Sequence, residues 1–342
     1  MKKPLQSTEY MYGSARIRAL ENRMVGRERM DALVEAKSTE EVLARLAEYG
    51  ISPTGEGEDA ATAATSKARE EMLLSVLRSA YCEVETACPD PTVFRWFRYP
   101  YDCNNIKAAM KCLIRDLPPE DMFFDFGTVP AEQVMELVRT GKYNAFPPAM
   151  AQAAPVAREA YAKTGDPQKI DAILDRACYT DMMQAVKATG DTTMMGWLSA
   201  KVDLLNLTLC LRIIRMARGD IGLTFLQDSL LPGGHLEAQT FISAYQEGEE
   251  ALWRKIMFGD YWKFALAVEK SNGSLAAVER CADDHWMGLV RDGARVAFGA
   301  PVLGGYLIGC ENSVKNIRIV LAAKDAGLPT EAIRERIRVS YV

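Results

Sequence analysis

The stretch that decides the fold lies at residues 99–107 and reads YPYDCNNIK. Its Asp-x-x-Asn-Ile pattern returns in altered form at residues 203–207, which read DLLNL, and at residues 313–317, which read SVKNI. The asparagines of the three copies are 101 and 110 residues apart, and an aromatic residue precedes each by nine or ten positions. These asparagines are Asn105, Asn206 and Asn316. Self-similarity at a long period predicts related structural units within one chain.

Two further kinds of element recur in the same order. A plausible helix start follows each copy and reads GTVPAE at 127–132, GHLEAQ at 234–239 and GLPTE at 327–331. An acidic residue followed by arginine occurs twice, in LDR at 174–176 and VER at 278–280. We therefore predict three homologous helical units, at residues 1–123, 124–230 and 231–342. We expect them to pack around a pseudo-threefold axis as a funnel.

Helix signals dominate the whole chain. Strong helix formers are dense, and apolar residues recur with i, i+3, i+4 spacing. Ser38 and Asp166-Pro167 read as capped helix starts, and residues 330–339 read as a C-terminal amphipathic helix. Residues 52–66 are rich in Gly, Ser and Thr and predict a loop. Because hairpin signals between alternating strands are absent, we predict an all-α fold.

Composition argues against several classes of function. The net charge is -5 and no long basic run occurs, which disfavours a nucleic-acid partner. No apolar run approaches the ~18 residues of a spanning helix, and we expect no secretory signal, because no apolar stretch follows residues 1–4. The eight cysteines form no CxxC pair and only two histidines are present, so we expect no metal and no cofactor. We expect a cytoplasmic protein that reaches a membrane only through other proteins.

Other short motifs lie in a fixed order around the repeats. They are YGSARIR at 12–18, LDRACY at 174–179, DLLN at 203–206, LR at 211–212, LLPGGHL at 230–236, NIR at 316–318 and RIRVSYV at 336–342. Together with the stretch at 99–107, they resemble the family that contains the d subunits of V-type ATPases and the C subunits of A-type ATP synthases. The resemblance runs from about residue 10 to the end, with departures at Thr208 and Ser313.

This resemblance implies a rotor adapter of the central stalk that is not an enzyme. The expected partners are the central shaft subunits of the D and F type and the membrane proteolipid ring of a rotary ATPase. Such an adapter would transmit torque and so couple ATP hydrolysis or synthesis to H⁺ or Na⁺ transport. Neither a catalytic residue nor a cofactor site is implied for this chain.

The repeated polar positions have two possible roles. They are Asp102, Asn105, Lys107, Asp203, Asn206, Arg212, Asn316 and Arg318. They could line the funnel and grip the shaft, or they could cross-link helices inside each unit, where buried polar groups need partners. Repetition favours the structural role, because contacts with one asymmetric shaft need not repeat threefold.

Two other classes of protein remain as alternatives. Asp283-Asp284-His285 could hold Mg²⁺ in an all-α metal-dependent enzyme, although no second acidic cluster with matching spacing accompanies it. The chain could also be a helical scaffold of an unrelated complex. Binding of the rotary ATPase ring and shaft would favour the adapter, and metal-dependent turnover of a small molecule would favour the enzyme.

Overall fold

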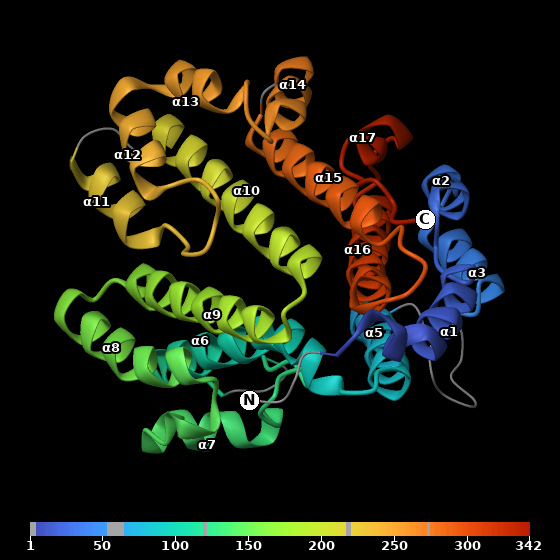
Figure 1. Ribbon diagram of the computed structural model, residues 1–342, viewed down its shortest axis with the longest axis horizontal. Coiled ribbons are helices and arrows are strands. Elements are labelled where there is room, and N and C mark those ends of the chain that lie inside the picture. Colours follow the sequence, from blue (N-terminus) through green and yellow to red (C-terminus); the bar gives the residue numbers. More distant parts are fainter. Residues whose placement is uncertain (1–4, 53–64, 119–121, 217–219, 272–273) are drawn as a thin grey trace. The chain divides into compact units, whose positions relative to one another are not determined.

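The computed structural model describes residues 5–52, 65–118, 122–216, 220–271 and 274–342. No strand occurs in these ranges, so the all-α prediction is confirmed for them. The α-helices are α1 Met11–Glu21, α2 Arg27–Glu35, α3 Thr39–Glu48, α5 Ser66–Ala87, α6 Tyr99–Arg115, α7 Ala131–Thr140, α8 Pro148–Thr164, α9 Pro167–Thr189, α10 Thr192–Met216, α11 Asp220–Ser229, α12 Ala238–Glu247, α13 Glu249–Ile256, α14 Trp262–Lys270, α15 Leu275–Gly293, α16 Ala300–Asp325 and α17 Thr330–Arg334 (Figure 1). Short 3₁₀ helices cover Ser7–Tyr10, Pro91–Arg98 and Tyr143–Ala145.

The chain divides into two compact units. The first contains Thr92–Trp262, and the second combines Leu5–Pro91 with Lys263–Val342. The second unit thus joins the two ends of the chain. We refer to them as the middle unit and the terminal unit.

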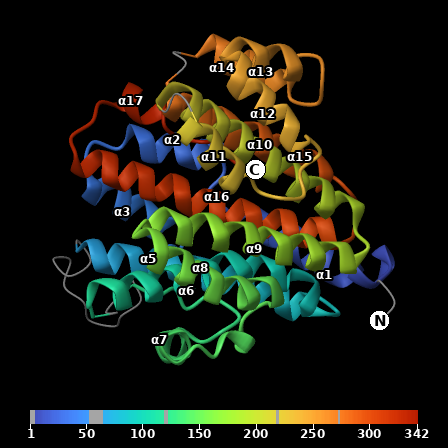
Figure 2. The same cartoon turned by 90° about the vertical axis from the view of Figure 1, so that its left-hand side faces the viewer.

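The middle unit is built on three long helices that pack side by side. Helices α8 and α9 form an antiparallel pair, and α6 lies along α9 (Figure 2). The turn between α8 and α9 follows from the sequence: Gly165 adopts a positive φ of 68°, and Asp166 accepts a hydrogen bond from the Gln168 amide at 2.9 Å. The fully buried Ile170 and Leu174 then anchor α9 in the core.

The terminal unit is organised around α16. Every residue from Ala300 to Cys310 is buried, because α16 packs against helices from both ends of the chain, including α1, α2, α3, α5 and α15. The predicted cap at Ser38 is confirmed, since its hydroxyl accepts from the Glu41 amide at the start of α3. Among the described residues, no helix has the length and apolarity needed to cross a bilayer.

One predicted element is shorter than expected. The sequence indicates a helix over 330–339, but α17 ends at Arg334. Beyond it the backbone of Arg338 and Val339 hydrogen-bonds to side chains of α15 and α16 instead of continuing a helical ladder. Most of the predicted loop at 52–66 lies outside the described residues.

Candidate functional site

The first copy of the repeated motif forms a polar clamp on a distant backbone segment. From α6, the Asn105 side chain accepts from the Phe124 amide at 2.9 Å and donates to the Phe124 carbonyl at 2.8 Å. One turn earlier, the Asp102 carboxylate accepts from the amides of Thr128 and Val129 at 2.8 and 3.1 Å, and from the Thr128 hydroxyl at 2.7 Å. Both side chains are fully buried, so these bonds supply the partners that buried polar groups require.

The second copy repeats this geometry on α10. Asn206 accepts from the Leu231 amide at 2.9 Å and donates to its carbonyl at 3.0 Å. Asp203 accepts from the amides of His235 and Leu236 at 2.8 and 3.0 Å. The buried Tyr261 hydroxyl donates to the same carboxylate at 2.6 Å, where the first clamp uses the Thr128 hydroxyl.

The third copy keeps the asparagine and takes its carboxylate from another helix. Asn316 of α16 accepts from the Arg338 amide at 3.0 Å and donates to the Arg338 carbonyl at 2.9 Å. Ser313 occupies the position of the aspartate in the other copies. The amide of Val339 instead donates at 2.7 Å to Asp284, which projects from α15.

The third clamp also connects the two ends of the chain. In the first two copies, a helix begins a few residues after the clamped segment, at Ala131 and Ala238. After the third clamped segment, the Val342 carbonyl accepts at 3.1 Å from the amide of Arg27, the first residue of α2. Helix α2 packs against the clamp helix α16, as α7 packs against α6 and α12 against α10. The helix start predicted at 327–331 exists as α17, but the asparagine of that copy binds Arg338.

The basic positions of the motif point away from the clamps. Lys107 pairs with Asp175 of α9 at 2.7 Å, and Arg318 pairs with Glu70 of α5 at 2.5 Å. Thr208, which replaces a base in the second copy, donates its hydroxyl to the Leu204 carbonyl in its own helix at 2.8 Å. The remaining position, Arg212, is an exposed residue of α10 outside the clamp.

Burial shapes the electrostatics of the clamps. It raises the pKa of the Asp102 carboxyl, and the hydrogen bonds from Thr128 and Val129 oppose that rise. It also raises the pKa of the Tyr261 hydroxyl, as does the hydrogen bond to Asp203, so Tyr261 remains a hydrogen-bond donor at neutral pH. The carboxylates of Asp102 and Asp203 thus accept their hydrogen bonds from groups within the protein.

A glycine lies beside the aspartate of each of the first two clamps, at a position where a side chain would collide with the carboxylate. A Cβ on Gly234 would lie 2.1 Å from Asp203 Oδ1, and one on Gly127 would lie 2.3 Å from Asp102 Oδ1. We expect Gly234→Ala to lower the free energy of unfolding by about 3 kcal/mol, because the buried carboxylate or its donors must move.

Urea denaturation monitored by circular dichroism measures that effect. Gly196→Ala is the matched control, since a Cβ at this position in α10 meets nothing within 4 Å. It should stabilise the protein by about 0.5–1 kcal/mol, because alanine restricts the unfolded chain more than glycine does. Equal effects of the two substitutions would contradict the steric explanation.

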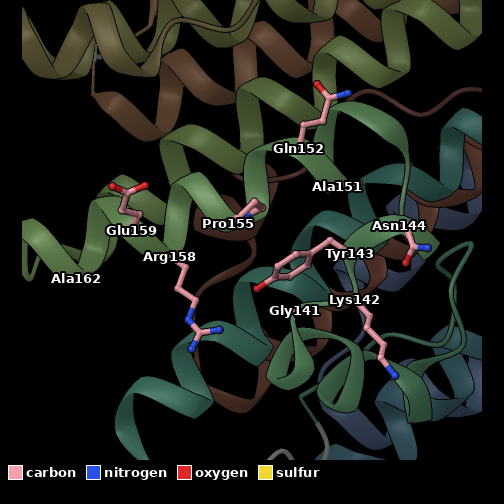
Figure 3. A pocket seen from close by; sticks show the side chains of 10 residues that line it. All are labelled: Gly141, Lys142, Tyr143, Asn144, Ala151, Gln152, Pro155, Arg158, Glu159 and Ala162. Carbon is pink, nitrogen blue, oxygen red and sulfur yellow. The ribbon is translucent and has the colours of Figure 1, made fainter.

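A hollow on the middle unit shares no lining residue with the clamps. It has a volume of about 700 Å³ and lies between the end of α7 and helix α8, with Tyr143, Gln152, Pro155 and Arg158 on its wall (Figure 3). Its lining acid, Glu159, pairs with Lys163 at 2.7 Å. Within the described ranges, no three His, Cys, Asp or Glu side chains gather as a metal-binding group.

Comparison with known families places these clamps in context. Residues 14–336 match the ATP synthase (C/AC39) subunit family. The chain belongs to this family. The match covers the helices of all three clamps, and the recognition based on the short motifs is confirmed. This C/AC39 subunit is thus of the C/d type found in V- and A-type ATPases, the rotary machines of ion transport.

Curated relatives of the C/AC39 subunit are distant but span most of its length. The C subunit of the A-type ATP synthase of Thermococcus kodakarensis is 21% identical, over 96% of this chain and 90% of that protein. The C subunit of the V-type sodium ATPase of Enterococcus hirae is 21% identical, over 75% of this chain and 78% of its own. The C subunit of the A-type ATP synthase of Methanothermobacter thermautotrophicus is 24% identical, over 96% and 87%.

Proposed function

We propose that this subunit is a non-catalytic adapter of the rotor, which joins the central shaft of a rotary ATPase to its membrane proteolipid ring. The observation that carries the proposal is the family match over residues 14–336. The direct partners would be shaft subunits of the D and F type and the ring itself. Torque passing through this body would couple ATP hydrolysis or synthesis to H⁺ or Na⁺ transport.

The clamps support a mechanical role. Each one fixes a non-helical segment to the middle of a long helix through hydrogen bonds between the segment's backbone and a buried asparagine, which is Asn105, Asn206 or Asn316. A body that transmits torque must resist local deformation, and close packing with satisfied buried polar groups gives that stiffness. We assign the repeated Asp and Asn side chains to this internal cross-linking and not to contact with the shaft.

We further propose three related units around a pseudo-threefold axis, one for each clamp. A hydrogen bond supports assigning α2 to the third unit together with α16. It runs from the Arg27 amide at the start of α2 to the Val342 carbonyl at the other end of the chain. The first unit would then begin near Thr92 instead of at the N-terminus, which agrees with the grouping of Leu5–Pro91 with Lys263–Val342.

The acidic pair that could seed a metal-dependent enzyme has structural partners. Asp283 pairs with Lys315 at 2.5 Å and with Arg338 at 3.1 Å. Asp284 accepts from the Val339 amide in the third clamp. Both carboxylates thus hold the C-terminal segment, which favours the adapter over the enzyme.

Salt dependence of ring binding tests the adapter role. The shaft and the ring differ in symmetry, so matched contacts cannot repeat around the ring, and polar complementarity should dominate binding. We expect the purified subunit to bind the isolated ring and to release it as salt rises from about 0.05 M to about 0.5 M, because screening weakens exposed charge contacts.

Pull-down on detergent-solubilised ring measures this release, and circular dichroism at each salt concentration shows that the subunit stays folded. Arg139→Gln removes an exposed charge and provides a baseline for nonspecific electrostatics. Failure of the folded subunit to bind ring or shaft at low salt would refute the adapter role.

A further inference from the structure

A cleft in the terminal unit has the character of a ligand site. It lies between α14 and α15 and has a volume of about 540 Å³. The two helices are labelled in Figure 1. This size falls within the range of cavities that hold small organic ligands. Lys263, Ala267 and Lys270 line it from α14, and Arg280 and Gly288 line it from α15.

The side chain of Arg280 lines this cleft and carries a buried hydrogen-bond donor. Its Nε–H is buried and has no hydrogen-bond acceptor among the described residues, which is unfavourable for a polar group removed from water. Arg176, which occupies the matching acidic-Arg motif on α9, instead donates to the carbonyls of Gln227 and Leu230 at 3.2 and 3.1 Å. The arginine of this motif therefore donates to backbone carbonyls on α9, whereas on α15 its Nε–H lies at a cleft without a protein acceptor among the described residues.

The two acidic residues that line the cleft already interact with other groups of the protein. Asp284 accepts from the Val339 amide; burial raises the pKa of its carboxyl, and that hydrogen bond and the positive charge of Arg280 oppose the rise. Asp292 forms an ion pair with Arg295 at 3.2 Å. Three cationic side chains (Lys263, Lys270 and Arg280) and two acidic ones (Asp284 and Asp292) line the cleft, which leaves its lining one positive charge in excess. An anion is the ligand that this charge pattern favours.

The cleft has room for more than a single ion. Gly288 lies in the middle of α15, and a Cβ built there would meet nothing within 4 Å. Ala267 is the facing residue of the α14 stripe, since residues 263, 267 and 270 share one side of a helix. The small side chains leave open space next to the cationic groups.

We propose that the α14–α15 cleft binds a phosphate-bearing ligand, anchored by the Arg280 guanidinium with Lys270 at the rim. The planar fork of arginine matches two phosphate oxygens, and lysine adds a point charge. Free phosphate compounds and the headgroups of anionic lipids share this chemistry. The proposal does not depend on the adapter role.

Titration of the full-length chain with inorganic phosphate tests the site. The side-chain Nε–Hε signal of Arg280, identified in NMR spectra by its loss in Arg280→Lys, should shift saturably. Arg280→Gln should weaken binding by about tenfold or more, the loss expected for a charged hydrogen bond. Gly288→Leu should block it by filling the cleft. Arg139→Gln removes an equal charge from α7 and should leave binding unchanged.

Vesicles distinguish the two sources of phosphate. Sedimentation with phosphatidylglycerol vesicles and with phosphatidylcholine vesicles should show whether binding that depends on Arg280 extends to anionic headgroups. Binding of phosphate or of phosphatidylglycerol that Arg280→Gln weakens by about tenfold or more supports the proposal and identifies the source. Absence of saturable binding to both probes, or equal losses in Arg280→Gln and Arg139→Gln, overturns it. Circular dichroism confirms that each variant is folded.

Discussion

Asp203→Ala is expected to lower the free energy of unfolding by about 3 to 5 kcal/mol, the range seen when a buried hydrogen-bonded charge is removed. The Asp203 carboxylate is fully buried and receives the amides of His235 and Leu236 and the hydroxyl of Tyr261. Alanine would leave all three donors without that acceptor in the interior. Few single substitutions in this chain should cost as much.

Two controls separate the clamp from an ordinary loss of charge. Tyr261→Phe removes one of the three donors and should cost about 1–2 kcal/mol. Asp228→Ala removes an aspartate whose partner, Lys169, lies at the surface of the middle unit, and should cost less than about 1 kcal/mol. Urea denaturation of the purified chain gives all three values. A cost for Asp203→Ala no larger than that for Asp228→Ala would mean that the second clamp contributes little to stability.

The fold class and the helix containing each clamp could be predicted from the sequence. Apolar periodicity and caps such as Ser38 and Asp166 are local signals, and the structure contains the helices that they indicate. The spacing of Asp102 and Asn105 places both on one helix face, where they lie together. These predictions needed only neighbouring residues.

The long-range parts of the clamps could not be predicted in this way. Arg338 lies in a stretch whose periodicity suits a helix, so its clamping by Asn316 shows only in the tertiary structure. In the third copy, Asp284 of α15 takes the role that the motif's own aspartate has in the other two. Predicting this would have required knowing that α15 passes beside Val339. The contact of Val342 with Arg27 joins opposite ends of the chain, which no local pattern encodes.

Loss of coupling is the largest functional effect that we expect. The polar side chains of the clamps are used inside the fold, and the acidic pair at 283–284 holds the C-terminal segment. On the proposed function, this subunit performs no chemistry and instead fills the gap between shaft and ring. Its removal should leave ATP hydrolysis by the soluble head largely intact while no torque reaches the ring.

Ion flux and ATP hydrolysis, measured together in vesicles reconstituted with and without this subunit, test the central claim most directly. Adding back the wild-type chain should restore pumping, and adding back Asp203→Ala at a temperature where that variant is unfolded should not. Complexes lacking the subunit should hydrolyse ATP without moving ions. Full ATP-driven ion pumping in its absence would contradict that claim.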